Sequence, residues 1–543
     1  MPFLPRRLPL LLLALALAGC LAPPKSPRTR PLLQWRFSDS VQDGLGARLD
    51  AAASAWNDLD APNRSRRARA ESVYEEALAG LLRTWNRAQA PYQWRDGALF
   101  HAGERSYRIR FTSDSHAEPV AAPELANLRL AAEVRPGRAE EIAVEGLGVP
   151  VVGQLDDPDA HPLLPPNGAH LTLTALLEFG PELPGQPREV HLRLVNPLQQ
   201  SRRRIAGRDW PLAANYTAAK ALALDDGFLK KFSLVGLFYP EKTLADSRIY
   251  QLDPYDPQRI PVVFVHGLMS DPHIWYPCIN AIYADPVLRA RYQPWYFLYP
   301  TGMSVPATSL RLRDSLAEAR RRLDPQAQAA ALNRMVLVGH SMGGLLSRMQ
   351  AVDSGTDFWD AHFRKPPEAM RVSGSARERL TRSLIFERRP EVARLVFITV
   401  PHRGSELADK GFAMRLARFV RLPVDSLMLA KDLFSGNTDA LQPQIEDWGP
   451  FAFLSLSSLS PKHPYLDVLN AKPIPVPHHS IIGHANGRTL EDSSDLVVPY
   501  RSAHLDTGSE LVVPHWHGCV EKPDVVAEVL RRLHQPLRES PTP

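Results

Sequence analysis

The chain has 543 residues, which leaves room for roughly two to four domains. Hydrophobic residues make up 44% of it, so a packed core is expected and wholesale disorder is excluded. The formal charge of +5 is small for this length and no zinc, homeodomain or RNA-binding signature occurs, which argues against a nucleic-acid partner. Cys20, Cys278 and Cys519 are too few for a disulfide scaffold and have no spacing that suits zinc.

The first residues are typical of a targeting segment. Arg6 and Arg7 precede an apolar run from Leu8 to Ala18, which is far shorter than the ~20 residues of a membrane-spanning helix. The run ends Leu-Ala-Gly-Cys20, which resembles the lipobox of bacterial lipoproteins. The resemblance implies that residues 1–19 are a signal peptide and that Cys20 becomes an acylated first residue. An ordinary secretory signal with an incidental cysteine is the alternative.

Lipid attachment would place the protein in the bacterial cell envelope, anchored to a membrane through Cys20. The residue after Cys20 is Leu21 and not aspartate, a pattern that in enteric bacteria indicates the outer membrane. The pattern does not distinguish the periplasmic from the surface side. Residues 20–33 are rich in proline and basic residues and predict a tether.

Residues 34–252 are predicted to form an N-terminal module that is first helical and then β-rich. Apolar residues recur at helical spacing in Val41–Trp56 and Arg66–Trp85, with Val73, Leu78, Leu81 and Leu82 as the expected core stripe. Short alternating runs bounded by turn residues then predict strands at Tyr107–Phe111, Leu171–Thr174 and Val190–Val195. The histidines of this module have no nearby acid at ligand-like spacing, so we expect no metal site in it.

From residue 253 to residue 535 the pattern becomes α/β, followed by a short tail, 536–543. Apolar runs predict strands, several of which are separated by helical stretches such as Ala307–Leu323, and this implies a mostly parallel sheet with helices on both faces. The expected strands are Ile260–Val265, Pro294–Tyr299, Met335–Val338, Arg394–Val400, His479–Gly483 and Leu511–Pro514.

The stretch from Met335 to Ala351 contains the strongest functional signal. Gly339-His-Ser341-Met342-Gly343 fits G-x-S-x-G and lies between a predicted strand and a predicted helix. In this context the serine sits on a strained turn and projects above the sheet at the start of a helix. We therefore expect Ser341 to be a nucleophile, with the Met342 N–H facing any negative charge that develops there.

A second motif follows the first predicted strand of the sheet. His266-Gly267-Leu268 would turn so that the Leu268 N–H forms the other half of an oxyanion hole. The motifs Val265-His-Gly-Leu268, Gly339-His-Ser-Met-Gly-Gly344 and Thr399-Val-Pro-His-Arg-Gly-Ser405 resemble those of bacterial lipases and esterases of the α/β-hydrolase superfamily. The resemblance covers about residues 254–533 and implies an α/β-hydrolase fold. Ser405 lacks an elbow and is not expected to be the nucleophile.

An acid and a base are needed to activate a serine, and in this fold they follow it in the order acid, then histidine. Ser494-Asp495-Leu496-Val-Val-Pro499 resembles the segment that carries the acid in related lipases, although Leu496 replaces the usual glycine. Asp495 is therefore the expected acid, with Asp492 and then Asp506 as alternatives.

The histidine is expected in the loop between the last strand and the last helix, Asp524–Leu533. His515 and His517 both lie there, two residues apart. The family spacing to Pro523 and the closing helix favours His517 as the base, with His515 as the alternative.

Residues from about 410 to 477 exceed a normal connection and contain apolar stretches, so they predict a cap insertion, either a lid over the site or a fixed structural element. The expected function is that of a lipid-anchored envelope serine hydrolase that cleaves carboxylic esters, lipid esters included, without a metal or an organic cofactor. The same residues could also serve acyl transfer or thioester cleavage. The alternative from another functional class is a binding or assembly lipoprotein whose hydrolase domain is inactive. The sequence does not indicate an oligomeric state.

Overall fold

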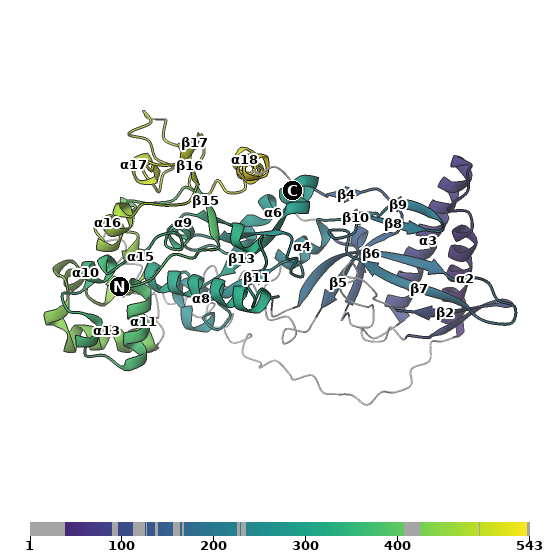
Figure 1. Ribbon diagram of the computed structural model, residues 1–543, viewed down its shortest axis with the longest axis horizontal. Coiled ribbons are helices and arrows are strands. Elements are labelled where there is room, and N and C mark those ends of the chain that lie inside the picture. The colour runs from purple at the N-terminus through teal and green to yellow at the C-terminus, as the bar shows by residue number, and fades with distance from the viewer. Residues whose placement is uncertain are drawn as a thin grey trace, which may run out of the picture.

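The computed structural model describes residues 39–88, 96–111, 125, 127–135, 140–155, 163–165, 168–224, 229, 235–406, 424–487 and 489–539. Two β-sheets with their helices lie side by side along the long axis of the molecule (Figure 1). The predicted signal peptide, the tether and Cys20 lie outside the described residues. Within the ranges given above, no helix combines the length and the apolar character that crossing a membrane requires.

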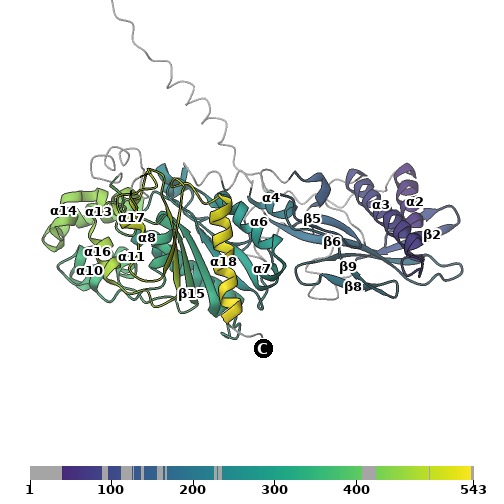
Figure 2. The same cartoon turned by 90° about the horizontal axis from the view of Figure 1, so that it is seen from above.

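The N-terminal module is a six-stranded sheet with two long helices packed on it, α2 (Asp39–Trp56) and α3 (Arg64–Ala88) (Figure 2). In sheet order the strands are β1 (Leu99–Ala102), β2 (Arg105–Arg110), β7 (Arg188–Val195), β6 (Ala169–Phe179), β5 (Val149–Leu155) and β3 (Asn127–Leu130). Two small ribbons complete it: β4 (Ala143–Val144) with β10 (Ala214–Asn215), and β8 (Arg202–Ile205) with β9 (Arg208–Pro211). The predicted helices and strands are therefore present.

One residue of the expected core stripe was assigned wrongly. Leu78, Leu81 and Leu82 are fully buried, but the Val73 side chain is 41% exposed. The adjacent Tyr74 takes the buried position, where its hydroxyl donates to the Leu177 carbonyl and accepts from the Leu177 N–H, at 2.8 and 2.7 Å. A tyrosine can occupy a core position when its hydroxyl both donates and accepts a hydrogen bond there. Hydrophobic periodicity alone does not predict such a position.

The C-terminal domain is built on a seven-stranded sheet that is parallel except for its first strand. In sheet order the strands are β11 (Arg248–Gln251), β13 (Tyr292–Leu298), β12 (Ile260–Val265), β14 (Met335–His340), β15 (Val392–Ile398), β16 (His478–Gly483) and β17 (Ser509–Val513). The edge strand β11 pairs antiparallel with β13 and begins before residue 253, where the change of pattern had placed the start of this domain. The six predicted strands match β12 to β17 within a few residues.

Alternate residues of the central strands pack into two hydrophobic cores, one on each face of the sheet, as expected for a sheet covered on both faces. Val263 and Val265 of β12 pack with α8 (Val305–Leu323) and α9 (Met342–Arg348). Val262 and Phe264 pack with helices on the other face: α4 (Ala218–Leu224), α6 (Tyr276–Ala284), α7 (Pro286–Arg291) and α18 (Pro523–Glu539). Figure 2 shows α18 running across the sheet beside α6.

The predicted cap region is helical over its described part, residues 424–477. It contains α13 (Val424–Gly436), α14 (Pro443–Trp448), α15 (Ser455–Ser458) and α16 (Pro464–Ala471). These helices gather at the end of the molecule away from the module, together with α10 (Asp357–His362) and α11 (Gly374–Leu384) (Figure 1). A backbone bridge between Phe363 and Leu441 joins the two groups. Two insertions, and not one, therefore form this end of the domain.

Candidate active site

Ser341 lies at the turn between β14 and α9, at the carboxyl edge of the sheet. Its φ of 52° and ψ of −126° are strained for a residue with a side chain, and its N–H donates to the Ile398 carbonyl at 2.9 Å. The helix after it packs very close to β12, because a Cβ added to Gly343 would lie 2.2 Å from the Val265 carbonyl oxygen. The glycine thus allows the strand–turn–helix geometry that the motif predicted.

His517 and Asp495 converge on this serine from loops that follow β17 and β16. The distance from Ser341 Oγ to His517 Nε2 is 2.8 Å, and the distance from His517 Nδ1 to Asp495 Oδ2 is also 2.8 Å. These three side chains form one continuous hydrogen-bonded chain from carboxylate to hydroxyl. The expected acid, base and nucleophile are therefore brought together in space.

The Asp495 carboxylate is held firmly in place. It is 1% exposed, and its Oδ1 accepts from the N–H groups of Val497 and Val498 at 2.8 and 2.6 Å. The main chains are also linked, since the His517 N–H donates to the Asp495 carbonyl at 3.0 Å. A carboxylate held by this many donors has a fixed orientation, and it fixes the direction of the histidine ring.

The loop of Asp495 has a leucine at the position where the lipase segment it resembles has a glycine. Leu496 adopts φ 75°, the left-handed region that a glycine would enter without strain. Its N–H donates to Ser494 Oγ at 3.0 Å, and a bridge between Ser494 and Pro499 closes the loop. The loop therefore places a 61% exposed leucine beside the acid, and the carboxylate still faces His517.

The alternatives weighed from the sequence lie elsewhere. His515 Nε2 is 2.8 Å from Asp524 Oδ1 at the start of α18, away from Ser341. Asp492 is exposed and accepts from the Thr489 hydroxyl, and the Asp506 side chain is 84% exposed beside Arg403. The hydroxyl of Ser405 donates to the Val497 carbonyl.

The loop after β12 lies against the serine. A Cβ added to Gly267 would stand 3.0 Å from Ser341 Cβ and 3.0 Å from His340 Nδ1, so the backbone of this loop approaches the nucleophile closely. Leu268 follows directly and packs against the core of the α8 face. Met342 is fully buried at the first position of α9, where the N–H groups of a helix start have no intrahelical partner.

His340, the residue before the serine, was not recognised as part of the site. Its Nε2 donates to the His517 carbonyl at 3.0 Å, and Thr399 Oγ1 donates to the same carbonyl at 3.2 Å. Burial, together with the neighbouring His517, lowers the pKa of His340 to about 3, so it remains neutral. It holds the main chain of His517 without adding positive charge next to the serine. Its position in G-x-S-x-G was a signal, but the pattern accepts any residue there.

The two cysteines of the described chain are not arranged for chemistry. Cys278 and Cys519 are both free and buried, and burial raises the pKa of each thiol to about 12. Over the described part of the chain, no group of three His, Cys, Asp or Glu side chains is placed to hold a metal ion. The chemistry that this arrangement can perform is nucleophilic attack by a serine.

Residues 262–529 match the alpha/beta hydrolase family. Together with the sheet order and the elbow, this match defines the C-terminal half as an α/β-hydrolase domain. No curated protein sequence matches the chain.

Similar solved structures include a lipase of Bacillus licheniformis in its mature form, with 17% identity over 52% of this chain and 97% of that chain, at a TM-score of 0.32. A lipase-esterase related protein from Clostridium acetobutylicum has 13% identity over 52% of this chain and 98% of that chain, at a TM-score of 0.28. Lipase 1 from Pelosinus fermentans has 13% identity over 52% of this chain and 100% of that chain, at a TM-score of 0.31.

Proposed function

We propose that the protein is a serine hydrolase that cleaves carboxylic esters with apolar acyl groups, using Ser341, His517 and Asp495 as a catalytic triad. The observation that carries the proposal is the pair of 2.8 Å contacts that link the three side chains in the order carboxylate, imidazole, hydroxyl. The match of residues 262–529 to the alpha/beta hydrolase family supports it.

In the proposed mechanism, Ser341 Oγ attacks the acyl carbonyl carbon while His517 Nε2 takes its proton. Asp495 holds the Nδ1–H and stabilises the imidazolium that forms. The carbonyl oxygen becomes an oxyanion that faces the N–H groups of Leu268 and Met342, and each such donor is worth about 10²–10³ in kcat. His517 then gives the proton to the leaving alcohol, and a water molecule releases the acid from the acyl-serine by the same steps.

A rim of exposed apolar side chains favours an apolar acyl group. Each of the three site loops places one such residue next to its functional residue: Met269 after Leu268, Leu496 after Asp495, and Trp516 before His517. Their side chains are 49%, 61% and 56% exposed. Large apolar side chains that are exposed next to the functional residues of one site favour an apolar binding partner. A long acyl chain fits this chemistry better than a small polar ester does.

We also propose that the protein is attached to the bacterial outer membrane through an acylated Cys20. The lipobox-like sequence supports this, and the apolar rim suits an enzyme that takes its substrate from a lipid surface. Cys20→Ser should block labelling by radioactive palmitate and leave the precursor uncleaved. Normal anchoring of this variant would contradict the proposal.

The decisive experiment is a panel of p-nitrophenyl esters from acetate to palmitate, run on the wild type and on Ser341→Ala. We expect turnover to rise with chain length and Ser341→Ala to lose about 10⁶ in kcat while it remains folded. A folded Ser341→Ala that turns over normally would exclude this nucleophile. A wild type that neither cleaves esters nor reacts with a fluorophosphonate probe would favour a binding protein with an inactive hydrolase domain.

A further inference from the structure

A cavity of about 800 Å³ lies beside the α/β sheet, lined by α8, α11, the segment around β11 and the cap helices. Among the described residues that line it, none belongs to the site around Ser341. This volume lies within the range of about 300–1,000 Å³ that small-molecule sites occupy. The cavity therefore has the size of a binding site, separate from the proposed catalytic centre.

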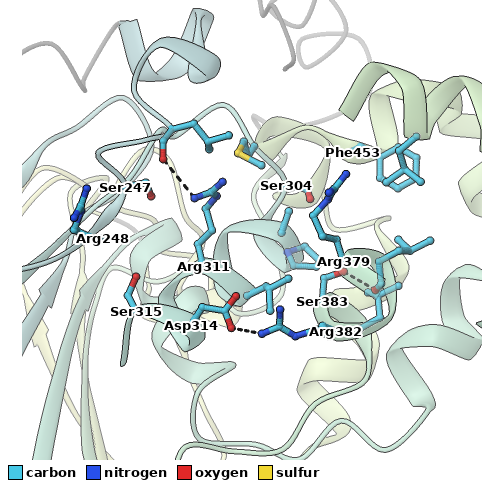
Figure 3. Close-up of a pocket in the computed structure, with 18 of the residues that line it drawn as sticks. Ser247, Arg248, Ser304, Arg311, Asp314, Ser315, Arg379, Arg382, Ser383 and Phe453 are labelled. Atoms are coloured by element: carbon cyan, nitrogen blue, oxygen red, sulfur yellow. Dashed lines mark hydrogen bonds and ion pairs between the residues drawn. The ribbon is translucent and has the colours of Figure 1, made fainter. Parts of the chain in front are cut away.

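One stripe of α8 forms the floor of the cavity. Ala307, Leu310, Arg311, Asp314 and Glu318 recur at helical spacing on its lining, whereas residues between them, such as Leu312 and Leu316, are fully buried against the sheet. Figure 3 shows Arg311 from α8 and Arg379 from α11 extending in the same direction, with Phe453 of the cap near Arg379. A polar helix face is normally covered by water, but here it is partly roofed by protein.

The charges on the lining are unbalanced. Among the described residues of the lining, five are arginines, Arg248, Arg311, Arg322, Arg379 and Arg382, and two are carboxylates, Asp314 and Glu318. The carboxylates are already used, since Asp314 pairs with Arg382 and Glu318 with Arg322. The described lining therefore carries an excess of positive charge in a half-open cavity, where electrostatic attraction is stronger than in open water.

Arg311 and Ser247 are the groups best placed to hold an anion. No carboxylate of the described chain lies within ion-pair distance of Arg311, which donates to the Leu244 carbonyl over a long 3.4 Å. Ser247 is 8% exposed, and in the described structure its buried hydroxyl has no hydrogen-bond partner. Burial lowers the pKa of Arg311, because its charge lacks full compensation. A partly buried guanidinium and a buried hydroxyl with unused hydrogen-bonding capacity favour a ligand with acceptor oxygens.

Apolar side chains line other parts of the cavity. Leu310, Leu380 and Leu384 line the cavity from the two helices, and Leu429 and Phe453 line it from the cap. A small inorganic anion would leave these walls without contacts, whereas an aliphatic chain would cover them.

We propose that this cavity binds an anionic amphiphile, with its acidic head at Arg311 and Ser247 and its aliphatic chain along the leucines and Phe453. The head can be the carboxylate of a fatty acid or the phosphate of a lipid, since both supply acceptor oxygens to a guanidinium. The segment from Thr301 to Met303 connects the two sites, because Met303 lines the cavity and Thr301 accepts from the Met269 N–H at 3.4 Å. Occupancy of the cavity can thereby influence the loop after β12.

The test measures binding and not turnover, so it does not depend on the proposed ester hydrolysis. Decanoate, decyl phosphate and neutral decanol are titrated into the full chain by isothermal titration calorimetry, in the wild type and in Ser341→Ala. We expect both proteins to bind decanoate or decyl phosphate at least tenfold more tightly than decanol. Preference for one of the two anions identifies the carboxylate or the phosphate as the natural head.

Two variants probe the head site and the chain site. Arg311→Gln should weaken binding of the preferred anion by roughly tenfold or more, because a charged hydrogen bond is lost. Its matched control is Arg321→Gln on the same helix, whose side chain is 70% exposed outside the cavity and should leave binding unchanged. Ala307→Phe, which fills space on the lining, should weaken binding of all three ligands.

Equal affinity for decanol and the anions, equal affinity of Arg311→Gln and Arg321→Gln, or no binding to the wild type would each overturn the inference. An inactive protein that binds decanoate as expected would overturn the proposed ester hydrolysis and leave this site standing.

Discussion

The choice between His515 and His517 gives the sharpest test of the proposed triad. The two residues are two positions apart, yet the structure gives them different partners: Ser341 and Asp495 for His517, and Asp524 for His515. Replacing each by alanine removes an imidazole from the same loop. The two variants should therefore disturb the loop similarly and differ in chemistry.

The expected magnitudes follow from these contacts. His517→Ala removes the proton acceptor of Ser341, and loss of a triad base costs about 10⁶ in kcat. His515→Ala removes a contact with Asp524, whose side chain is 47% exposed, and such exposed pairs contribute about 0–1 kcal/mol to stability. We expect it to lose less than tenfold in kcat and at most a few degrees in Tm.

The assay is hydrolysis of p-nitrophenyl octanoate, with circular dichroism to show that both variants are folded. The double variant Ser341→Ala/His517→Ala should be hardly worse than either single variant, because triad members act as a unit. An inactive His515→Ala beside an active His517→Ala would refute the assignment of the base. Additive losses in the double variant would refute the claim that the two residues act in one step.

Three further predictions concern the acid, the apolar rim and stability at low pH. Asp495→Asn should keep the fold but lower kcat by about 10⁴, because the amide favours the wrong histidine tautomer. Asp492→Asn is the control, and equal activity of the two variants would exclude Asp495 as the acid of the triad. Trp516→Ser should raise KM for long-chain esters by roughly threefold to tenfold, about 1 kcal/mol, and leave KM for the acetate ester unchanged. The control is Leu183→Ser, which is also exposed but lies on the module and should change neither KM. An equal rise in KM for short and long esters in Trp516→Ser would contradict an acyl-binding rim. Burial lowers the pKa of His266 and His362 to about 4 and of His340 and His463 to about 3. Each is neutral in the folded protein and takes a proton on unfolding below pH ~6.5, so stability should be fully present above that pH and fall by up to about 1.4 kcal/mol per pH unit per histidine towards pH 4. Urea unfolding at pH 7, 6 and 5 measures this, and unchanged stability over that range would refute it.

The parts of the site that were predicted are those fixed by local sequence. The elbow around Ser341 depends on a β-rich run, on glycines where the backbone passes close to β12, and on a helix, all within about twenty residues. The fold class follows from apolar strands alternating with helices, which is also a local pattern. The chain order of acid and histidine then limits the partners to a few residues.

The parts that could not be predicted depend on contacts distant in sequence. The direction of Asp495 is set by a loop in which Leu496 takes a left-handed conformation, and the sequence alone did not indicate that leucine would accept it. The role of His340 depends on the His517 carbonyl, which is 177 positions away. β11 was missed because it has four residues and lies at an edge, where pairing and not hydrophobic pattern defines the strand.

The junction between the module and the hydrolase domain shows most clearly how sequence pattern and packing can differ. Lys220 of α4 is fully buried and pairs with Asp253, whose other carboxylate oxygen accepts from the Tyr283 hydroxyl of α6. Burial pushes the pKa of Lys220 down, and the Asp253 carboxylate opposes this shift.

A buried ammonium is tolerated only when it is paired, and removal of one partner of a buried pair is strongly destabilising. The residues around Lys220 belong to the same apolar cluster as β12 and α6, and the Thr217 hydroxyl donates to Asn280 Oδ1 of α6 at 2.9 Å. The change of pattern at residue 253 therefore falls inside a continuous core, and the residues before it help to stabilise the face of the sheet opposite α8.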